Sequence, residues 1–245
     1  MSARAASELS AAGAASLAPE SGPSAPRIEV KFALHEGALD AVETWLRTSR
    51  LAFRPAYAVR RINNLYFDTV EAGALADKLD GISARAKVRY RWYGESPAPA
   101  PGQLEVKLRR NGVGWKETFP VTAVPACAGR AAFVRALRAI LPARARLWLD
   151  LAPEPMLINR YVRAYHVSAD GRVRATVDRG LVAYDQRVGP FPQLTGRAPL
   201  PPVVVLELKL PQAARAAAVR ELADLGFVAS AYSKYEVALR AIADR

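Results

Sequence analysis

Polar and apolar residues alternate along much of the chain after residue 26, which is typical of β-strands with one buried and one polar face. The clearest case is residues 85–92, RAKVRYRW, where four basic residues stand two positions apart. Side chains two positions apart point to the same side of a strand, so this segment predicts a strand that carries a row of four cations. The same plan recurs in the segments 29–31, 103–109, 172–178 and 205–209.

Between these segments, apolar residues recur at three- and four-residue spacing, which predicts amphipathic helices. Four such stretches are Glu36–Arg50, Arg130–Leu141, Ala213–Leu225 and Ser233–Ala243. Pro-rich segments predict loops, and none of them separates two self-sufficient sets of apolar segments. Asn111–Gly114 predicts a hairpin turn rather than a phosphate-binding loop. We therefore expect an α+β fold in a single domain, with helices covering the apolar faces of the strands.

The first 26 residues predict a disordered tail. Nine Ala, six Ser, three Pro and two Gly make up most of this segment, which can therefore bury almost nothing. A signal peptide is disfavoured, because Leu9 and Leu17 alone do not form an apolar core. We expect residues 27–245 to form the folded domain. No apolar run approaches the length of a membrane helix, so we expect a cytoplasmic protein without membrane insertion.

Charge adds a second signal to the strand pattern. The chain has 245 residues, with 35 Lys and Arg against 23 Asp and Glu, and a formal net charge of +12. The hydrophobic fraction of 51% is enough for a core. Lysine is scarce, and six of the seven lysines fall on or near the charged strand faces: Lys31, Lys87, Lys107, Lys116, Lys209 and Lys234.

The charged strand faces have two interpretations. Each could be the solvated side of an antiparallel sheet, or all could converge inside a barrel whose apolar side lies under helices. Glu and Lys two positions apart in three of the strands fit convergence better. A row of like charges repels itself unless an anion or carboxylates neutralise it. The surplus of cations predicts a polyanionic ligand, and Glu29, Glu105, Glu207 and Asp178 predict a divalent cation beside it.

Nucleic acid is the alternative polyanion. Trp92, Tyr93 and Trp115 could stack on bases, but no helix-turn-helix, zinc finger or RNP-like motif is present. Phosphate-binding loops, kinase motifs and nucleophile elbows are also missing from the sequence. The chain has one cysteine and two histidines, too few for a cysteine-based or a histidine-rich zinc site. Tyr66 and Asp68 could be catalytic, although packing at a strand end explains them equally well.

An ordered series of short motifs resembles the VTC domain of the triphosphate tunnel metalloenzyme, or CYTH-like, superfamily, the catalytic module of polyphosphate polymerases. The resemblance runs from about Arg27 to Ala243 and is carried by the order of the motifs, since each is weak alone. They are Arg27–Phe32, Leu65–Thr69, Lys87–Gly94, Leu104–Lys107, Arg160–Tyr165, Arg174–Asp178, Leu206–Lys209 and Ser233–Tyr235.

This resemblance implies an eight-stranded antiparallel β-barrel with covering helices, whose lumen binds ATP and inorganic polyphosphate or triphosphate with Mn²⁺ or Mg²⁺. The catalytic phosphate clamps that it implies are Arg89, Arg91, Lys107, Arg163 and Arg174. Other substrate-binding residues would be Lys31, Lys87, Lys116, Tyr161, Lys209, Ser233 and Lys234. The implied metal ligands are Glu207, Glu105 and Glu29, although a cross-strand salt bridge is the alternative for Glu105 and Glu207.

The reaction implied is transfer of the ATP γ-phosphate to a polyphosphate chain. Two alternatives remain open: a metal-dependent triphosphatase, as in sister members of the superfamily, and a polyphosphate-binding module without catalysis. Triphosphatases of the superfamily usually begin with Glu-x-Glu-x-Lys, whereas this chain has Arg27 in the first of those positions. That departure favours transfer over hydrolysis. No specific nucleic acid partner is expected.

Overall fold

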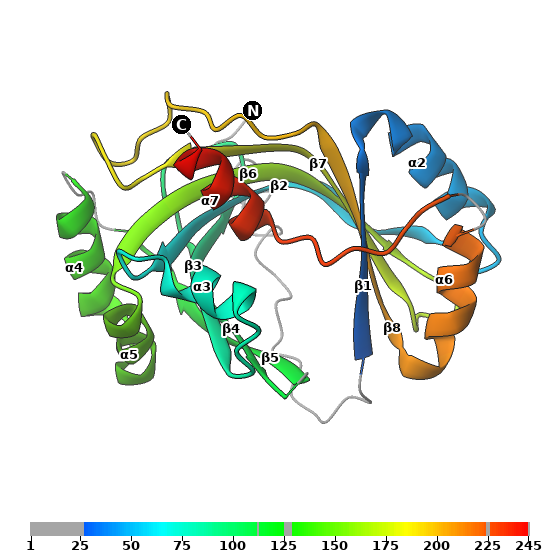
Figure 1. Ribbon diagram of the computed structural model, residues 1–245, viewed down its shortest axis with the longest axis horizontal. Helices are drawn as coiled ribbons and strands as arrows, with labels where there is room; N and C mark the ends of the chain where they lie inside the picture. Colours follow the sequence, from blue (N-terminus) through cyan, green and yellow to red (C-terminus); the bar gives the residue numbers. More distant parts are fainter. Residues whose placement is uncertain (1–26, 112, 125–128, 224–225, 245) are drawn as a thin grey trace, which may run out of the picture.

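The computed structural model describes residues 27–111, 113–124, 129–223 and 226–244. The expected N-terminal tail lies outside these residues. One sheet of eight strands curls into an arch, as Figure 1 shows. Its strands are β1 (Arg27–His35), β2 (Arg54–Asp68), β3 (Arg85–Tyr93), β4 (Gly102–Arg110), β5 (Val113–Val121), β6 (Glu154–Val167), β7 (Arg174–Asp185) and β8 (Val203–Pro211).

The strands follow the order β1-β8-β7-β6-β2-β3-β4-β5, and every neighbouring pair is antiparallel. The two longest strands, β2 and β6, pair along most of their length and form the roof of the arch. The expected α+β fold with eight antiparallel strands is confirmed. Within the described chain, β1 and β5 form the two edges and do not pair, so the sheet is an open arch rather than a closed barrel.

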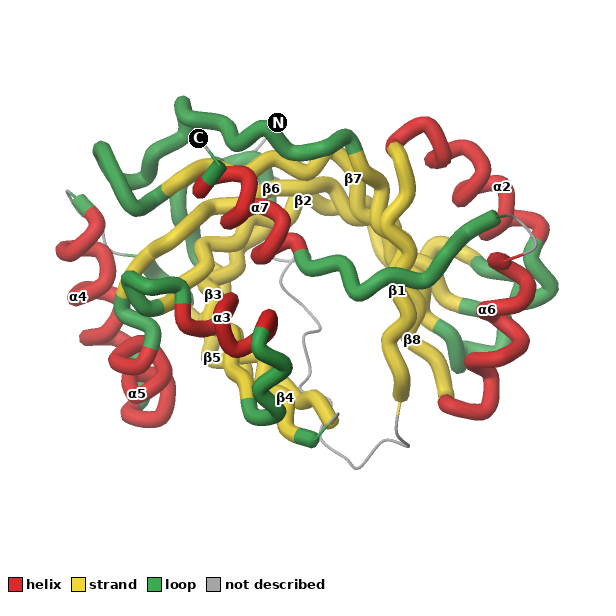
Figure 2. Tube along the Cα trace, in the orientation of Figure 1, coloured by secondary structure: helices red, strands yellow, loops and turns green. Residues whose placement is uncertain are grey.

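The helices occupy both sides of this sheet (Figure 2). They are η1 (Glu36–Ala38), α2 (Leu39–Thr48), α3 (Gly73–Leu79), α4 (Arg130–Ile140), α5 (Ala143–Leu151), η2 (Gln212–Ala214), α6 (Arg215–Ala223) and α7 (Lys234–Ala243). All four predicted helical stretches are confirmed, with ends shifted by a few residues. Helices α3 and α5 were not predicted, because α3 has only seven residues and α5 buries only two apolar side chains, Ala145 and Leu149.

The outer face of the arch is covered by two pairs of helices. Trp45 and Leu46 of α2 pack with Leu222 of α6 on the apolar side of β1, β8 and β7. Phe133 of α4 and Leu149 of α5 pack on the apolar side of β2, β3 and β4. Burial of these side chains drives the helices onto the sheet, since each removes apolar surface from water. The charged residues that alternate with the covered ones therefore face the inside of the arch.

Helix α7 differs from this plan, because it packs on the inner face. Tyr235, Leu239 and Ile242 form an apolar cluster with Tyr66 of β2 and Leu157 of β6. The expectation that every predicted helix covers the outer face is therefore wrong for α7. The inner face is apolar at this end of the roof, so an amphipathic helix can bury its stripe there and place its N-terminus beside the charged residues.

The expected hairpin between β4 and β5 is confirmed, with Leu108 paired to Trp115. Gly102, at the start of β4, stands opposite Trp92 of β3. A Cβ at this position would lie 2.1 Å from the carbonyl oxygen of Arg91. The close approach of β3 and β4 therefore requires glycine at position 102.

Candidate functional site: the cationic inner face

The strand register gathers the residues singled out in the sequence on the inner face. Ten cationic side chains and four carboxylates on this face were singled out in the sequence, so the formal charge of this set is 10 − 4 = +6. The cations are Lys31, Lys87, Arg89, Arg91, Lys107, Lys116, Arg163, Arg174, Lys209 and Lys234. The carboxylates are Glu29, Glu105, Asp178 and Glu207.

Three lysines stand abreast across the wall formed by β3, β4 and β5. Lys87 pairs with Lys107, and Lys107 pairs with Lys116. Neighbouring strands lie about 4.8 Å apart, and like charges directly opposite one another destabilise a sheet. The Lys107 Nζ lies 3.5 Å from Glu29 on β1, and the Lys116 Nζ lies 3.0 Å from Glu105. No carboxylate of the described chain is paired with Lys87 in the same way.

Lys87 is consequently the cation of this row whose charge is least compensated by a carboxylate. Its Nζ donates to the hydroxyl of Ser233 at 3.2 Å and lies 5.5 Å from the ring centre of Tyr235. Burial lowers the pKa of Lys87 to about 8, Lys78 and Lys107 add to the effect, and Tyr66 and Glu236 oppose it. A phosphate oxygen near Nζ would offset both the repulsion between the lysines and the free-energy cost of burying the charge.

Glu105 holds a cluster of three cations on the same wall. Its Oε2 accepts from Arg89 at 2.7 Å and lies 3.5 Å from Arg91, and its Oε1 accepts from Lys116 and from Gln103. Only 1% of the Glu105 side chain is exposed. Burial alone would raise the pKa of Glu105, but the three cations hold it well below its usual range. Both oxygens are thus engaged, which favours the salt-bridge interpretation over a metal ligand.

Asp178 organises the opposite side of the inner face. Arg163 donates to both of its oxygens, at 2.5 and 2.6 Å, and Lys234 lies 2.6 Å from Oδ2. Burial opposes the charge of Asp178, but Arg163 and Lys234 lower its pKa nevertheless. The Lys234 Nζ also lies 4.9 Å from the ring centre of Tyr161. Asp178 therefore fixes a strand residue and a residue of α7 in one place.

Glu29 and Glu207 alternate with lysines on β1 and β8. Glu29 pairs with Lys209 and Glu207 pairs with Lys31 across the two strands. The shortest cation contact of Glu207 is 3.5 Å, to Lys209. Burial raises the pKa of Glu29, but Lys107 and Lys31 outweigh it and lower the value to about 2. Burial and the neighbouring Glu29 raise the pKa of Glu207, and the surrounding cations bring it below its usual value.

These two carboxylates are the candidates for holding a divalent cation, and a metal ion at Glu29 would compete with Lys31, whose Nζ lies 2.5 Å from the Glu29 Oε1. Mg²⁺ is commonly held by one or two carboxylates together with substrate phosphate oxygens. Glu29 and Glu207 supply two such groups, and among the described residues the shortest ion-pair contact of Glu207 is 3.5 Å, to Lys209. No set of three or more acidic, histidine or cysteine ligands occurs in the part of the chain that the structure describes. A metal there would need ligands from the phosphates.

The remaining residues from the sequence analysis take supporting positions. Ser233 caps the N-terminus of α7 by accepting from the backbone N–H of Glu236, and also accepts from Lys87. Tyr161 is buried, with its ring 5.4 Å from the Arg163 guanidinium. Arg174 is exposed and pairs with Lys209 in the β7–β8 register.

Sequence reasoning missed two asparagines in the roof. Asn64 donates to Asn159 at 2.8 Å and accepts from Arg91 at 2.8 Å, and all three residues are buried. The amide nitrogen of Asn159 is buried and has no partner among the described residues. The signal available in the sequence was the pair Asn63–Asn64 between Ile62 and Leu65, because buried amides require partners.

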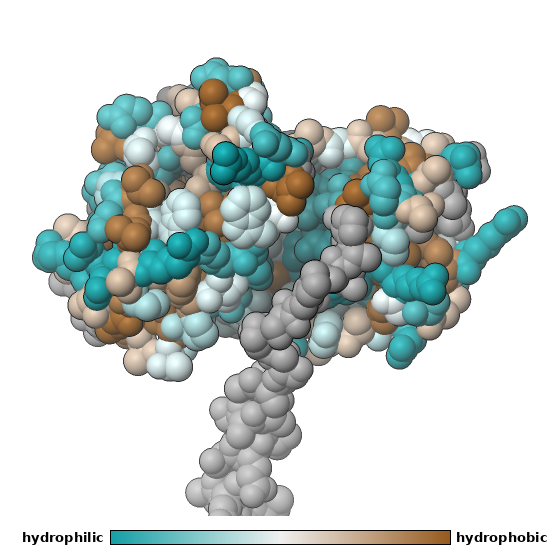
Figure 3. All heavy atoms as spheres, turned by 90° about the horizontal axis from the view of Figure 1, so that it is seen from below, coloured by the Kyte–Doolittle hydropathy of each residue, from teal (hydrophilic) through white to brown (hydrophobic). Residues whose placement is uncertain are grey.

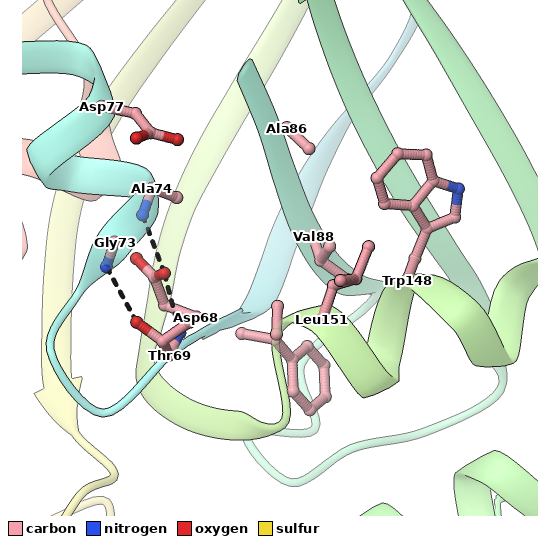
Figure 4. Close-up of a pocket in the computed structure, with 11 residues that line it drawn as sticks. Asp68, Thr69, Gly73, Ala74, Asp77, Ala86, Val88, Trp148 and Leu151 are labelled. Atoms are coloured by element: carbon pink, nitrogen blue, oxygen red, sulfur yellow. Dashed lines mark hydrogen bonds between the residues drawn. The ribbon is translucent and has the colours of Figure 1, made fainter. Parts of the chain in front are cut away.

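Asp68 is the last residue of β2, and its contacts agree with packing at a strand end. Its Oδ1 accepts from the N–H groups of Thr69 and Ala74, and its Oδ2 accepts from the Tyr235 hydroxyl. Figure 4 shows Asp68 beside a pocket between α3 and α5, lined by Val88 and other residues of the outer face. The carboxylate thus anchors α3 and α7.

The family model described as VTC domain matches residues 26–243. No curated protein matches the chain. A solved protein from Vibrio parahaemolyticus described as a "putative adenylate cyclase" has 12% identity and a TM-score of 0.44, with 86% of this chain and 96% of that chain covered. A protein from Pyrococcus horikoshii OT3 has 12% identity and a TM-score of 0.44, with 88% and 99% covered.

None of the helices in the described part of the chain combines the length and the apolar character needed to cross a bilayer.

Proposed function

Because the chain belongs to the VTC domain family, we propose that it is an ATP-dependent polyphosphate polymerase that works on the inner face of the arch. The observation that carries the proposal is the excess of cations over carboxylates on this face, ten against four among the residues singled out in the sequence. Such an excess suits a ligand with several negative charges along its length. Figure 3 shows hydrophilic side chains on both flanks of the molecule in the view toward the open side of the arch.

The reaction is transfer of the γ-phosphoryl group. The bond between the γ-phosphorus and the β,γ-bridging oxygen breaks, a terminal oxygen of the polyphosphate chain bonds to the γ-phosphorus, and ADP leaves. No covalent intermediate with the protein is required. Phosphoryl transfer passes through a loose transition state, so alignment and charge stabilisation supply most of the catalysis. This agrees with an inner face that is rich in Arg and Lys.

The residues divide this work between them. Arg89 and Arg91 are held by Glu105, and Arg163 is held by Asp178, so their guanidinium groups are oriented before the ligand arrives. Preorganised charges need no rearrangement when the reaction occurs. Lys87, which has no carboxylate partner in the described chain, is the cation most favourable for a phosphate oxygen.

The metal ion expected for this family fits Glu29 and Glu207. A bound Mg²⁺ or Mn²⁺ would neutralise phosphate charge and polarise the phosphoryl group. The lysines beside these carboxylates, Lys31 and Lys209, would remain available to the phosphate chain. Hydrolysis needs the same groups and a water molecule in place of the acceptor chain.

The test is ³¹P NMR of the purified protein with ATP and Mg²⁺, following ADP, orthophosphate and internal phosphoanhydride phosphorus. We expect internal phosphoanhydride signal to grow together with ADP. Release of orthophosphate without that signal would show that the protein is a triphosphatase. An unchanged spectrum would favour a binding module without catalysis.

The site itself is tested by Lys87→Met, which removes a cation without leaving a carboxylate unpaired. We expect this variant to lose polymer formation without a fall in melting temperature, because the buried charge of Lys87 opposes folding. Glu117→Gln, on the outer face beside Arg144, is the matched control and should retain the activity.

A further inference from the structure

A cluster of three tyrosines around one arginine lies at the end of the cationic inner face. The Arg60 guanidinium carbon lies 5.6 Å from the ring centre of Tyr57, 5.9 Å from that of Tyr93 and 6.0 Å from that of Tyr165. Tyr57 and Tyr165 meet at an interplanar angle of 86°, with ring centres 5.6 Å apart. We call Tyr57, Arg60, Tyr93 and Tyr165 the Arg60 cluster.

The Arg60 cluster continues the phosphate-binding strands. Tyr93 follows Arg91 by two residues on β3, and Tyr165 follows Arg163 by two residues on β6. Arg60 itself is directly opposite Arg163 in the β2–β6 register. Residues two apart on a strand share a face, about 6.6 Å from one another. The cluster therefore adjoins the arginines proposed to bind phosphate, on the same side of the sheet.

The chemistry of the Arg60 cluster differs from that of its neighbours. Arg91 and Arg163 form ion pairs with carboxylates, whereas the Arg60 guanidinium lies against the rings of tyrosines. Tyr57 is 60% exposed, which leaves a large part of its ring open. Rings and a planar guanidinium offer stacking surfaces to any flat aromatic ligand, and a phosphate chain has no such part.

Nearby, the buried hydroxyl of Tyr232 has no partner among the described residues. Tyr232 and Tyr93 pack against the same apolar group, formed by Ile62, Tyr161 and Leu181. A buried hydroxyl usually finds a hydrogen-bond partner, so the surroundings of Tyr93 offer both stacking surface and an unused polar group.

We infer that the Arg60 cluster binds the nucleobase of a nucleoside triphosphate whose phosphates lie on the adjoining inner face. This inference rests on the proposed function and adds an orientation to it. The donor nucleotide would enter from the end formed by the start of β2 and the ends of β3 and β6. The acceptor chain has no base, so it would extend toward Lys87, Lys107 and Lys209, and the cluster would distinguish donor from acceptor.

Isothermal titration tests this with two ligands, ATP and inorganic tripolyphosphate, on the full chain. Base stacking on aromatic side chains is sequence-tolerant and substantial. We expect Tyr57→Ala to weaken ATP binding about five-fold or more and to leave tripolyphosphate binding unchanged. Tyr57→Phe keeps the ring and should restore the affinity for ATP.

The matched control is Trp115→Ala, which removes an aromatic ring that is 47% exposed and lies on β5, in register with the start of β3, whereas Tyr93 is at the other end of that strand. It should change neither affinity. Equal loss of ATP and tripolyphosphate binding in Tyr57→Ala, or no loss of either, would overturn the inference and leave the proposed function standing. Failure of the wild-type protein to bind either ligand would remove the proposed function as well.

Discussion

Two walls of the arch carry mixed charge in different ways. On β3 and β4, one carboxylate that is 1% exposed, Glu105, holds three cations at fixed positions. On β1 and β8, two carboxylates, Glu29 and Glu207, alternate with lysines, and the contacts of Lys31 range from 2.5 Å with Glu29 to 3.9 Å with Glu207. The first wall is a rigid frame that holds its cations around one buried anion, whereas the second distributes two carboxylates among lysines. If the proposed function is correct, the first wall orients phosphates and the second holds the metal ion.

The rigid wall should give the largest effect on stability. Glu105→Gln would leave Arg89, Arg91 and Lys116 without their common anion, and breaking a buried ion pair from one side is strongly destabilising. We expect the free energy of unfolding to fall by about 3 kcal/mol, measured by urea denaturation. Tripolyphosphate should recover part of this loss by binding the released cations.

Glu117→Gln is the control for that comparison, because Glu117 pairs with Arg144 on the outer face. An exposed ion pair contributes about 1 kcal/mol or less. Equal losses in the two variants would show that Glu105 is not an organising group.

The other wall should respond through metal binding. Glu207→Gln removes the carboxylate with the longest cation contacts, so we expect a loss of about tenfold or more in Mn²⁺ affinity, as even outer-sphere ligand partners are worth this much. The measurement is electron paramagnetic resonance titration of Mn²⁺ with tripolyphosphate present. Glu105→Gln should leave Mn²⁺ affinity much less affected, and an unchanged affinity in Glu207→Gln would favour the salt-bridge interpretation of that residue.

Lys87, on the wall formed by β3 and β4, predicts a pH dependence. Lys87 has a pKa of about 8 in the folded protein against 10.5 ordinarily, so the unfolded chain binds the extra proton between these values. The free energy of unfolding without ligand should therefore rise with pH across that window. Tripolyphosphate affinity should fall by up to about tenfold from pH 7 to pH 9, because the ligand requires the charged lysine.

Calorimetric titrations of the wild type and Lys87→Met at both pH values check this. The variant should bind more weakly at pH 7 and lose most of the pH dependence. A wild-type affinity that stays constant from pH 7 to pH 9 would contradict the role of Lys87.

The smallest effect on stability is expected at Ser233, which links the start of α7 to Lys87 on β3. Ser233→Ala removes the cap of α7 and the acceptor for Lys87. Loss of such a cap costs about 1 kcal/mol. Thermal unfolding should show a small decrease, and Ser233→Asp, which can cap the helix, should reverse it. An unchanged melting temperature in Ser233→Ala would mean that packing of Tyr235 alone holds the start of α7.

The strand faces were predictable from the sequence, because period-two alternation fixes which side chains share a side. The pairing of Arg89 with Glu105 was not, since it depends on the register between two strands. Arg60 was missed because the β2–β6 pairing shifts between Tyr57 and Arg60, and the alternation fails there. The inner position of α7 could not be foreseen either, as an apolar stripe shows that a helix packs but not on which side of a sheet.

The open edges of the arch have a consequence for a linear polymer. Strands β1 and β5 are not hydrogen-bonded to one another in the described chain, and the contact between Lys107 and Glu29 is an ion pair from β4 to β1. If the protein acts on polyphosphate as proposed, a polymer would have to open this ion pair to enter the inner face from the side. A partly exposed ion pair is weak, so the middle of a long polymer could be captured without its terminus.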